Sequence, residues 1–430
     1  MWDDRKSVRS WVMYDWANSA FATTIMAAVM PIYFQKGIGG TDAGWAFTQT
    51  ASAVVIAVLA PLLGAMADHY GNKKAYLRFF TYLGAAASVC LAFPGNGDVL
   101  FASLLVILGM IGIGGGGTFY DALLNDVASP ANREKVSARG YAMGYLGGGL
   151  LLVVNLLLIQ KPETFGLPDS AAGSKLSFVT VGIWWLVFSL PLFRNVKETA
   201  SATRGRLGGQ VKEGIRRLGE TARQIRHYPE LWKYMIAYWF LFDGVNTVIV
   251  MATSYGTTIG IEDSALIGAL LITQFVGYPA TVGFGALAAR LGGKTMLYAS
   301  MATYLIIVVL GFFMTNALHF FVLAGLVGLV QGGSQATARA IYSRLIPPAR
   351  TAEFNGFLTF TSRFFSFGGP LVFGLVKIFT DSSRYAILAV AFFFVAAMAM
   401  LTFVNVAKGE REALRAFGEP ADGTARSPSM

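Results

Sequence analysis

The apolar residues of this chain form long runs that are separated by shorter polar segments. A helix that crosses a bilayer needs about 20 mostly apolar residues, and twelve runs come close to that length. They lie near residues 10–34, 44–67, 76–94, 99–121, 139–159, 175–193, 233–258, 264–288, 295–315, 318–341, 354–376 and 384–406. We therefore predict an all-α integral membrane protein with twelve transmembrane helices.

The composition also favours a membrane protein. Of the 430 residues, 55% are hydrophobic and 13% are charged, whereas a soluble chain carries about 25% charged residues. The single cysteine excludes a disulfide framework, and His69, His227 and His319 do not have the spacing of metal ligands. We expect neither a metal nor a cofactor.

The net charge of +10 is distributed as a topology signal. Most of the 34 Lys and Arg residues lie at the N-terminus, after the even-numbered runs and in the tail. The loops on the other side hold only Lys36, Lys161, Lys175, Lys377 and Arg384. Because cytoplasmic loops carry the excess of Lys and Arg, we predict that both termini are cytoplasmic, in a bacterial-type inner (plasma) membrane. The basic residues form no single patch, which argues against a nucleic-acid partner.

A long polar segment divides the chain near its middle. We predict a first six-helix bundle at 1–194, a cytoplasmic linker at 195–231, a second six-helix bundle at 232–407 and a cytoplasmic tail at 408–430 that becomes disordered after a further helical turn or two. In the linker, apolar residues recur at helical spacing beside several arginines, as in a basic amphipathic helix on a membrane surface; they are Val211, Ile215, Leu218, Ala222 and Ile225. This helix is either a tether between the bundles or a lipid sensor.

The two halves of the chain repeat one another. The first run carries Tyr14-Asp15-x-x-Asn18-Ser19, and the seventh carries Phe242-Asp243-x-x-Asn246-Thr247. Thr48-Gln49 in the second run has its counterpart in Thr273-Gln274 in the eighth. Duplicated six-helix halves joined by a cytoplasmic loop form a parallel repeat, in which the substrate lies near the midplane between the halves.

Several motifs resemble a known family. The string G-x-x-x-D-H-x-G-x-K-K from Gly64 to Lys74 resembles the signature loop of the major facilitator superfamily, and it follows the second of twelve runs as that loop does. The strings YDWANSAF, SARGYAMGYLGGGL and LVQGGSQA resemble the vacuole-effluxer-like branch, whose fungal members export amino acids from vacuoles. This resemblance implies the major facilitator fold of two pseudo-symmetric six-helix bundles. It also implies that Gly64, Asp68, Gly71 and Lys73 form a cytoplasmic gating loop.

Two carboxylates lie at matching places inside the predicted spans. Asp15 and Asp243 each share a helix face with polar neighbours three and four residues on. A charged residue at the centre of a span costs about 2.5–3.5 kcal/mol on insertion scales, so these faces point to the protein interior or to a watery cavity. The residues that we predict along a substrate or proton pathway are Asp15, Asn18, Ser19, Gln49, Asp243, Asn246, Thr247, Gln274 and Arg363. The alternative for the carboxylates is structural, with each locking its helix against a neighbour.

Two arginines fall inside predicted spans. Arg363 lies near the middle of the eleventh run and needs an anion, either a neighbouring carboxylate or the carboxylate of a substrate. Together with Asp15 and Asp243 it suggests a zwitterionic solute. Arg339, near the inner end of the tenth run, is predicted to extend its side chain to the membrane surface in a structural role. Asp121 is expected to cap a helix end and to pair with Arg133 or Arg139.

The fourth run contains a literal G-x-G-x-x-G at Gly112, Gly114 and Gly117. This string follows no strand and lies within an apolar helix, which excludes a nucleotide-binding loop. We predict instead that small residues allow close helix packing here and at Gly148, Gly332 and Gly333.

We conclude that the sequence predicts a monomeric secondary transporter rather than an enzyme. Its partners are a small-molecule substrate, protons and the lipid bilayer. The predicted activity is movement of a small polar or zwitterionic, amino-acid-like solute by alternating access, coupled to protons. A flippase for lipids or amphiphiles on the same fold, or a transporter-like membrane sensor, is the alternative.

Overall fold

The computed structural model describes residues 2–70, 72–198, 228–258, 263–365, 368–380 and 382–418, together with residues 216, 223, 225 and 261. Within these residues the secondary structure is helical and contains no strand. The predicted amphipathic helix of the linker therefore lies outside the described residues, apart from those three linker positions. Of Asp68, Gly71 and Arg363 no side-chain placement is described.

The first half of the chain folds into long helices with one irregular member. They are α1 (Arg5–Ala20), η1 (Phe21–Val29), α2 (Met30–Lys36), α3 (Asp42–Tyr70), α4 (Lys73–Cys90), α5 (Val99–Val127), α6 (Arg133–Gln160) and α7 (Ser170–Asn195). The segment η1 is a π-helix that joins α1 to α2, so these three form one continuous helical run. Segments of π-helix often occur at functional sites, so η1 is a candidate part of such a site.

The second half has a similar series, but two of the predicted runs there each correspond to two helices. Its helices are α9 (Pro229–Thr258), α10 (Asp263–Leu291), α11 (Gly293–Phe312), α12 (Ala317–Leu345), α13 (Thr351–Phe365), α14 (Gly368–Thr380), α15 (Ser383–Ala389), α16 (Ala391–Thr402) and α17 (Val406–Gly418). The predicted run 354–376 is divided between α13 and α14, and the run 384–406 is divided between α15 and α16.

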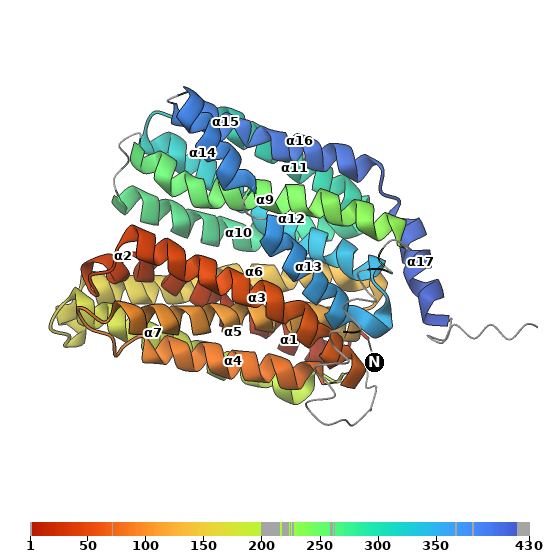
Figure 1. Ribbon diagram of the computed structural model, residues 1–430, viewed down its shortest axis with the longest axis horizontal. Helices are drawn as coiled ribbons and strands as arrows, with labels where there is room; N and C mark the ends of the chain where they lie inside the picture. Colours follow the sequence, from red (N-terminus) through yellow and green to blue (C-terminus); the bar gives the residue numbers. More distant parts are fainter. Residues whose placement is uncertain are drawn as a thin grey trace, which may run out of the picture.

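The helices gather into two groups that lie side by side (Figure 1). Helices α1–α7, here called the first half, pack together, and α9–α16, the second half, pack together beside them. The halves meet where α3 packs on α13 and where α6 packs on α10 and α12. We call the end of the molecule at which α1 begins and α17 lies the terminal end. The exact bundle limits 1–194 and 232–407 remain predictions.

Each predicted apolar run coincides with a helix or with consecutive helical segments. Among the described residues, nine helical runs are long and apolar enough to cross a membrane. The helices outside these nine runs include α4, which begins with Lys73 and Lys74, α9, which carries charged residues, and α13 and α14. The structure thus confirms an all-helical membrane protein, whereas the count of twelve spans remains a prediction.

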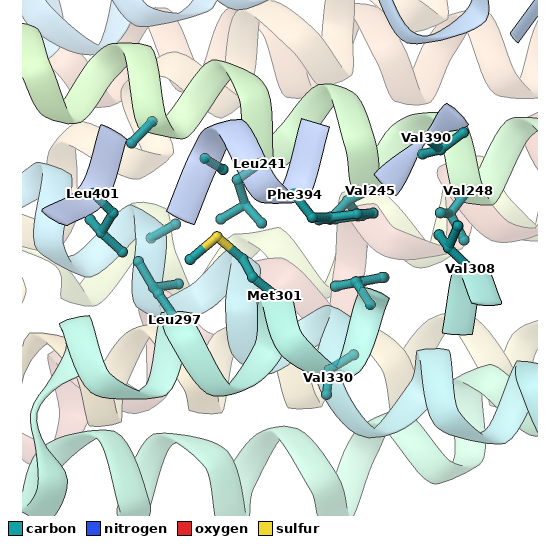
Figure 2. Close-up of a cluster of buried hydrophobic side chains, with 14 of the residues drawn as sticks. Leu241, Val245, Val248, Leu297, Met301, Val308, Val330, Val390, Phe394 and Leu401 are labelled. Carbon is teal, nitrogen blue, oxygen red and sulfur yellow. The ribbon is translucent and has the colours of Figure 1, made fainter. Parts of the chain in front are cut away.

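Each half has its own apolar core. In the second half, Leu241 and Val245 of α9 face Met301 of α11 and Phe394 of α16, all of them buried (Figure 2). Lipid tails are as apolar as these side chains, so close packing rather than removal from water holds such helices together within a bilayer.

The tail begins with a helix. The chain forms α17 up to Gly418, and α17 packs on the end of α12; the predicted disorder of the tail remains a prediction. Glu230 holds the start of α17. Its carboxylate accepts hydrogen bonds from the backbone N–H of Asn405 at 2.8 Å and from the ammonium of Lys408 at 3.3 Å. Arg344 donates to Glu410 at 2.9 Å. These polar anchors lie beyond the apolar pattern and could not be read from it. Residues 419–430 lie outside the described residues.

Five of the six predicted packing glycines lie against a neighbouring helix. A Cβ atom added at Gly112 would lie 2.5 Å from the Cα atom of Gly84, so α4 and α5 approach each other closely there. The corresponding contacts of the other four, at 2.1–2.9 Å, are with Ile56 for Gly114, Thr23 for Gly148, Thr281 for Gly332 and Phe284 for Gly333. Gly117 differs from its prediction: nothing lies within 4 Å of its added Cβ. The reason is that it faces a cavity.

These two glycines of α5 form a matched pair for a stability test. Gly112→Ala is expected to destabilise the protein by about 1–3 kcal/mol, because the helix backbones must separate to admit the methyl group. Gly117→Ala is expected to be neutral or to stabilise by up to about 1 kcal/mol, since alanine favours the helix and space is free. Thermal unfolding of both variants in the same detergent measures the difference. Equal melting temperatures would contradict the close approach of α4 and α5.

Candidate functional site

A central cavity of about 340 Å³ lies between the two halves, where α5 faces α9 and α13. Its polar lining comes from both halves and consists of Thr118 and Asp121 of α5, Asp243 and Asn246 of α9, and Asn355, Thr359 and Ser362 of α13. Aromatic side chains of α9 complete the wall. A cavity of this size, with a few polar groups in a largely apolar protein, is typical of small-molecule sites.

One carboxylate oxygen of Asp243 has a hydrogen-bond partner, and the other has none among the described residues. Its side chain is 7% exposed, and Oδ2 accepts a hydrogen bond from the backbone N–H of Gly369 at 2.8 Å. Oδ1 has no hydrogen-bond partner within the described structure, although it is buried. Buried polar atoms are normally hydrogen-bonded, so a free carboxylate oxygen at a cavity wall indicates a position for a bound group.

The close approach of α14 to α9 explains how Asp243 is held. The backbone N–H of Gly369 on α14 donates to its carboxylate. A Cβ atom at Gly369 would lie 1.7 Å from Thr247 Oγ1, so only glycine lets α14 come this close to α9. The glycine thus brings a backbone donor to a buried acid.

Asp15, the counterpart of Asp243 in the sequence repeat, has a different environment. It is buried, its Oδ2 accepts a hydrogen bond from the hydroxyl of Tyr120 at 2.7 Å, and the guanidinium of Arg339 lies 3.6 Å away. Arg339 belongs to α12 of the second half, so this contact crosses between the halves. The two repeated carboxylates are therefore not equivalent: Asp15 is paired with a cation, and Asp243 is not paired with one in the part of the chain that the structure describes.

The placement of Arg339 differs from its prediction. It does not reach the membrane surface but is 7% exposed and enters the first half. Its Nη1 donates to Asp121 Oδ1 at 3.0 Å, and its Nε donates to the hydroxyl of Ser137 at 2.9 Å. The guanidinium lies inside the protein because two carboxylates and several hydrogen-bond acceptors bind it there. These partners come from other helices, so the spacing of residues along the chain did not predict them.

Aromatic rings enclose the same guanidinium. The rings of Trp11 and Tyr141 lie 4.9 Å and 4.4 Å from its central carbon, within the range of cation–π contact. Asp121 likewise differs from its prediction, since it pairs with Arg339 rather than with Arg133 or Arg139. Asp121 is 35% exposed and lines the central cavity, so it connects the cavity with the Arg339 cluster.

Further polar contacts close the terminal end between the halves. The ammonium of Lys73 donates to Thr351 at 2.8 Å and to Asp126 at 3.3 Å. Arg344 of the second half pairs with Glu134 of the first half at 2.9 Å. Of the predicted gating loop, Lys73 thus makes a contact across the halves. A Cβ atom at Gly64 would lie 2.3 Å from the carbonyl oxygen of Ala352, which brings α3 against α13.

Arg133 adds a backbone contact across the same interface. It donates from Nη1 to the carbonyl oxygen of Ser343 at 2.8 Å. Such hydrogen bonds to the last carbonyls of α12 hold the end of that helix against the first half.

The remaining predicted pathway residues are scattered. Asn246 lines the central cavity, and Thr247 donates to the backbone oxygen of Asp243 at 2.7 Å. Asn18 and Ser19 are half-buried on α1, and Gln49 is exposed on α3; none of these three lines the central cavity. Sequence reasoning missed Trp239, Asn355 and Ser362, for which a polar or aromatic residue within an apolar run was the only available signal.

A second cavity of about 320 Å³ lies between η1 and helices α9–α12, farther from the terminal end. Most of its lining is apolar, and Gln274, Thr23 and Gln331 are among its few polar members. Gln274 is therefore near a cavity as predicted, but not near the central one. Among the described residues, no group of three or more His, Cys, Asp or Glu side chains is arranged to hold a metal ion.

Known proteins resemble this chain in sequence. A family model described as "Vacuole effluxer Atg22 like" matches residues 45–132 and 125–414. YxiO of Bacillus subtilis, an uncharacterized MFS-type transporter, is 36% identical over 408 residues, which cover 93% of this chain and 95% of that protein. Autophagy-related protein 22 of Cryptococcus neoformans is 28% identical over 301 residues, and the match covers 65% of this chain and 52% of that protein.

Solved structures resemble the chain in fold. The proton:xylose symporter XylE, of the major facilitator superfamily, matches with a TM-score of 0.70 at 15% identity, covering 96% of this chain and 99% of that one. The major facilitator transporter FucP in the outward conformation matches with a TM-score of 0.68 at 15% identity, covering 94% and 99%.

Proposed function

Because this chain belongs to the vacuole effluxer Atg22-like family and has the major facilitator fold, we propose that it moves a small polar or zwitterionic, amino-acid-like solute by proton-coupled alternating access. It is an integral, multi-pass membrane protein and a transporter of the major facilitator type rather than an enzyme. The proposal adds to this class the kind of solute, the site and the coupling ion.

The observation that carries the proposal is the central cavity between the halves. Its volume of about 340 Å³ suits a solute of amino-acid size, and both halves contribute polar groups to it. Contacts between the halves close the terminal end, at Lys73 with Thr351 and at Arg344 with Glu134. Alternating access requires a site of this kind, whose closure on one side depends on contacts that can separate.

Proton coupling is proposed for Asp243. A buried carboxylate with one unpartnered oxygen gains most from taking up a proton or a cationic group, because an isolated charge is poorly tolerated away from water. Asp15 is proposed as a gating residue, since Arg339 neutralises it only while the halves are closed at the terminal end. Arg363 is proposed to bind the carboxylate of the solute.

The setting of the transporter is proposed from the charge pattern and from the relatives. An inner membrane with both termini in the cytoplasm agrees with the distribution of Lys and Arg and with a bacterial relative of nearly the same length. The terminal end is then the cytoplasmic end. Export is the proposed direction because the family description names effluxers. A monomer is the proposed assembly.

A second candidate is a flippase for an amphiphile. The observation that favours it is the second cavity, whose largely apolar wall would suit an acyl or aliphatic tail. The central cavity favours the polar solute, because its lining includes two carboxylates and two asparagines.

A screen by thermal shift followed by transport tests the proposal. Purified protein is expected to be stabilised by one or more amino acids, peptides or related zwitterions rather than by sugars or organic acids. The same solute is expected to enter proteoliposomes, and faster when a pH gradient is imposed. Stabilisation by lipids alone, with no flux of polar solutes, would favour the flippase, and flux that ignores the pH gradient would remove the proton coupling.

A further inference from the structure

The described lining of the central cavity carries negative charge without a matching basic group. Asp121 and Asp243 lie on opposite sides, one from each half, and no Lys, Arg or His is among the described residues that line the cavity. Arg339 neutralises part of this charge from outside the cavity wall, but it is shared between Asp121 and Asp15. One carboxylate, that of Asp243, is left without a cation among the described residues.

Two residues of this wall each carry a buried oxygen atom without a hydrogen-bond partner among the described residues. Asp243 Oδ1 is buried in a side chain that is 7% exposed, and it has no partner among the described residues. The hydroxyl of Ser362 on α13, also part of the cavity wall, is likewise buried without a partner in the described structure. A group that binds Asp243 Oδ1 must donate a hydrogen bond, and the hydroxyl of Ser362 can accept a second one from the same group. A donor that carries positive charge is favoured beside a carboxylate.

Aromatic rings form another part of the wall. Tyr238 and Phe242 of α9 stack with their ring centres 4.0 Å apart, and both line the cavity with Trp239. The indole N–H of Trp239 donates to Thr361 at 3.2 Å, which fixes the orientation of its ring. Faces of Trp and Tyr attract organic cations. No group of three or more His, Cys, Asp or Glu side chains among the described residues is arranged to hold a metal ion.

We propose that the central cavity recognises an organic ammonium group, which donates hydrogen bonds to Asp243 Oδ1 and Ser362 Oγ beside the aromatic wall of α9. The proposal rests on the proposed transport function, because it names the chemical group that the solute presents. The negative charge of Asp121 and Asp243 would repel a solute carboxylate beside them. A solute that has a carboxylate must therefore hold it away from these two residues. Recognition therefore depends on the amine more than on a carboxylate.

Three matched probes separate these groups in the purified full-length protein. They are L-methionine, which has both charges, L-methioninamide, which keeps only the ammonium, and N-acetyl-L-methionine, which keeps only the carboxylate. Calorimetric titration is expected to show binding of the first two and at least about tenfold weaker binding of the third, since a charged hydrogen bond is lost. Binding of N-acetyl-L-methionine as tight as that of L-methioninamide would overturn the proposal.

Variants locate the effect. Asp243→Asn is expected to weaken L-methioninamide binding at least about tenfold, and Ser362→Ala by a smaller factor. Asp98→Asn, which removes a carboxylate from an exposed loop, is the control and should bind as the wild type does. Unchanged binding by a folded Asp243→Asn variant would contradict the proposal. If that variant does not fold, the wild-type probe series decides by itself.

The outcome also separates this inference from the transport proposal. If none of the three probes binds while another solute from the screen is moved in proteoliposomes, the ammonium site is wrong and the transporter stands. If no solute of any class is moved, the transport proposal itself fails.

Discussion

The Arg339→Met variant is expected to lose about 3–5 kcal/mol of stability, because breaking a buried ion pair leaves uncompensated charge. Methionine fills a similar volume, but Asp121 loses its 3.0 Å partner and Asp15 loses the guanidinium 3.6 Å away. The hydroxyl and the carbonyl oxygen of Ser137 also lose their donor. Thermal unfolding in detergent measures the loss, and transport in proteoliposomes is expected to fall with it because the halves no longer close correctly.

A matched arginine provides the control. Arg344 also joins the halves, through Glu134, but it is 26% exposed and therefore partly screened by solvent, so Arg344→Met is expected to cost less stability than Arg339→Met. Adding Asp15→Asn and Asp121→Asn to Arg339→Met removes the uncompensated charges and is expected to restore most of the stability. Equal losses of stability for Arg339→Met and Arg344→Met, or no recovery of stability in the triple variant, would contradict the prediction. They would show that the buried ion pairs of Arg339 do not hold the halves together.

The Asp243→Asn variant is expected to abolish accumulation driven by a pH gradient. With a gradient of about two pH units and one coupled proton, the wild type can accumulate solute up to about 100-fold. Asparagine keeps the shape of the side chain and can still accept the hydrogen bond from Gly369, but it cannot take up a proton. Uptake of labelled solute into proteoliposomes, with and without the gradient, measures the change.

Two controls show whether a lost gradient response means lost coupling. The melting temperature of Asp243→Asn should stay near that of the wild type. Counterflow of solute in the absence of a pH gradient should also persist, because a variant that binds solute more weakly can still exchange it. Asp98→Asn should respond to the gradient as the wild type does. A folded Asp243→Asn variant that still concentrates solute with the gradient would mean that the proton is carried elsewhere.

Local pattern was a good guide to the helices and to the two carboxylates. Apolar runs predicted where the long helices lie, since hydrophobic periodicity and length are properties of the chain itself. The motif shared by Asp15 and Asp243 singled out two acids that the structure shows to be buried, and burial of an acid within an apolar helix is readable from neighbouring residues. The family motifs indicated the fold in the same way.

The residues that contact each other across the fold could not be predicted from the sequence. Arg339 was predicted to reach the membrane surface, and it binds Asp121 instead, 218 positions away in the sequence. Gly117 was grouped with the packing glycines because it shares their motif, although its neighbour is a cavity. Nothing in the apolar run 354–376 indicated that the backbone N–H of Gly369 would donate to Asp243.

The sequence by itself determined the membrane class, the approximate helices, the repeated halves and the two buried acids. Each of these depends on residue type and spacing along one segment. Only the tertiary structure decided that Asp15 is paired across the halves while Asp243, which lines the central cavity, has one oxygen without a partner among the described residues. The reason is physical: the environment of a buried charge is set by side chains from other helices, and their approach depends on how the two halves pack.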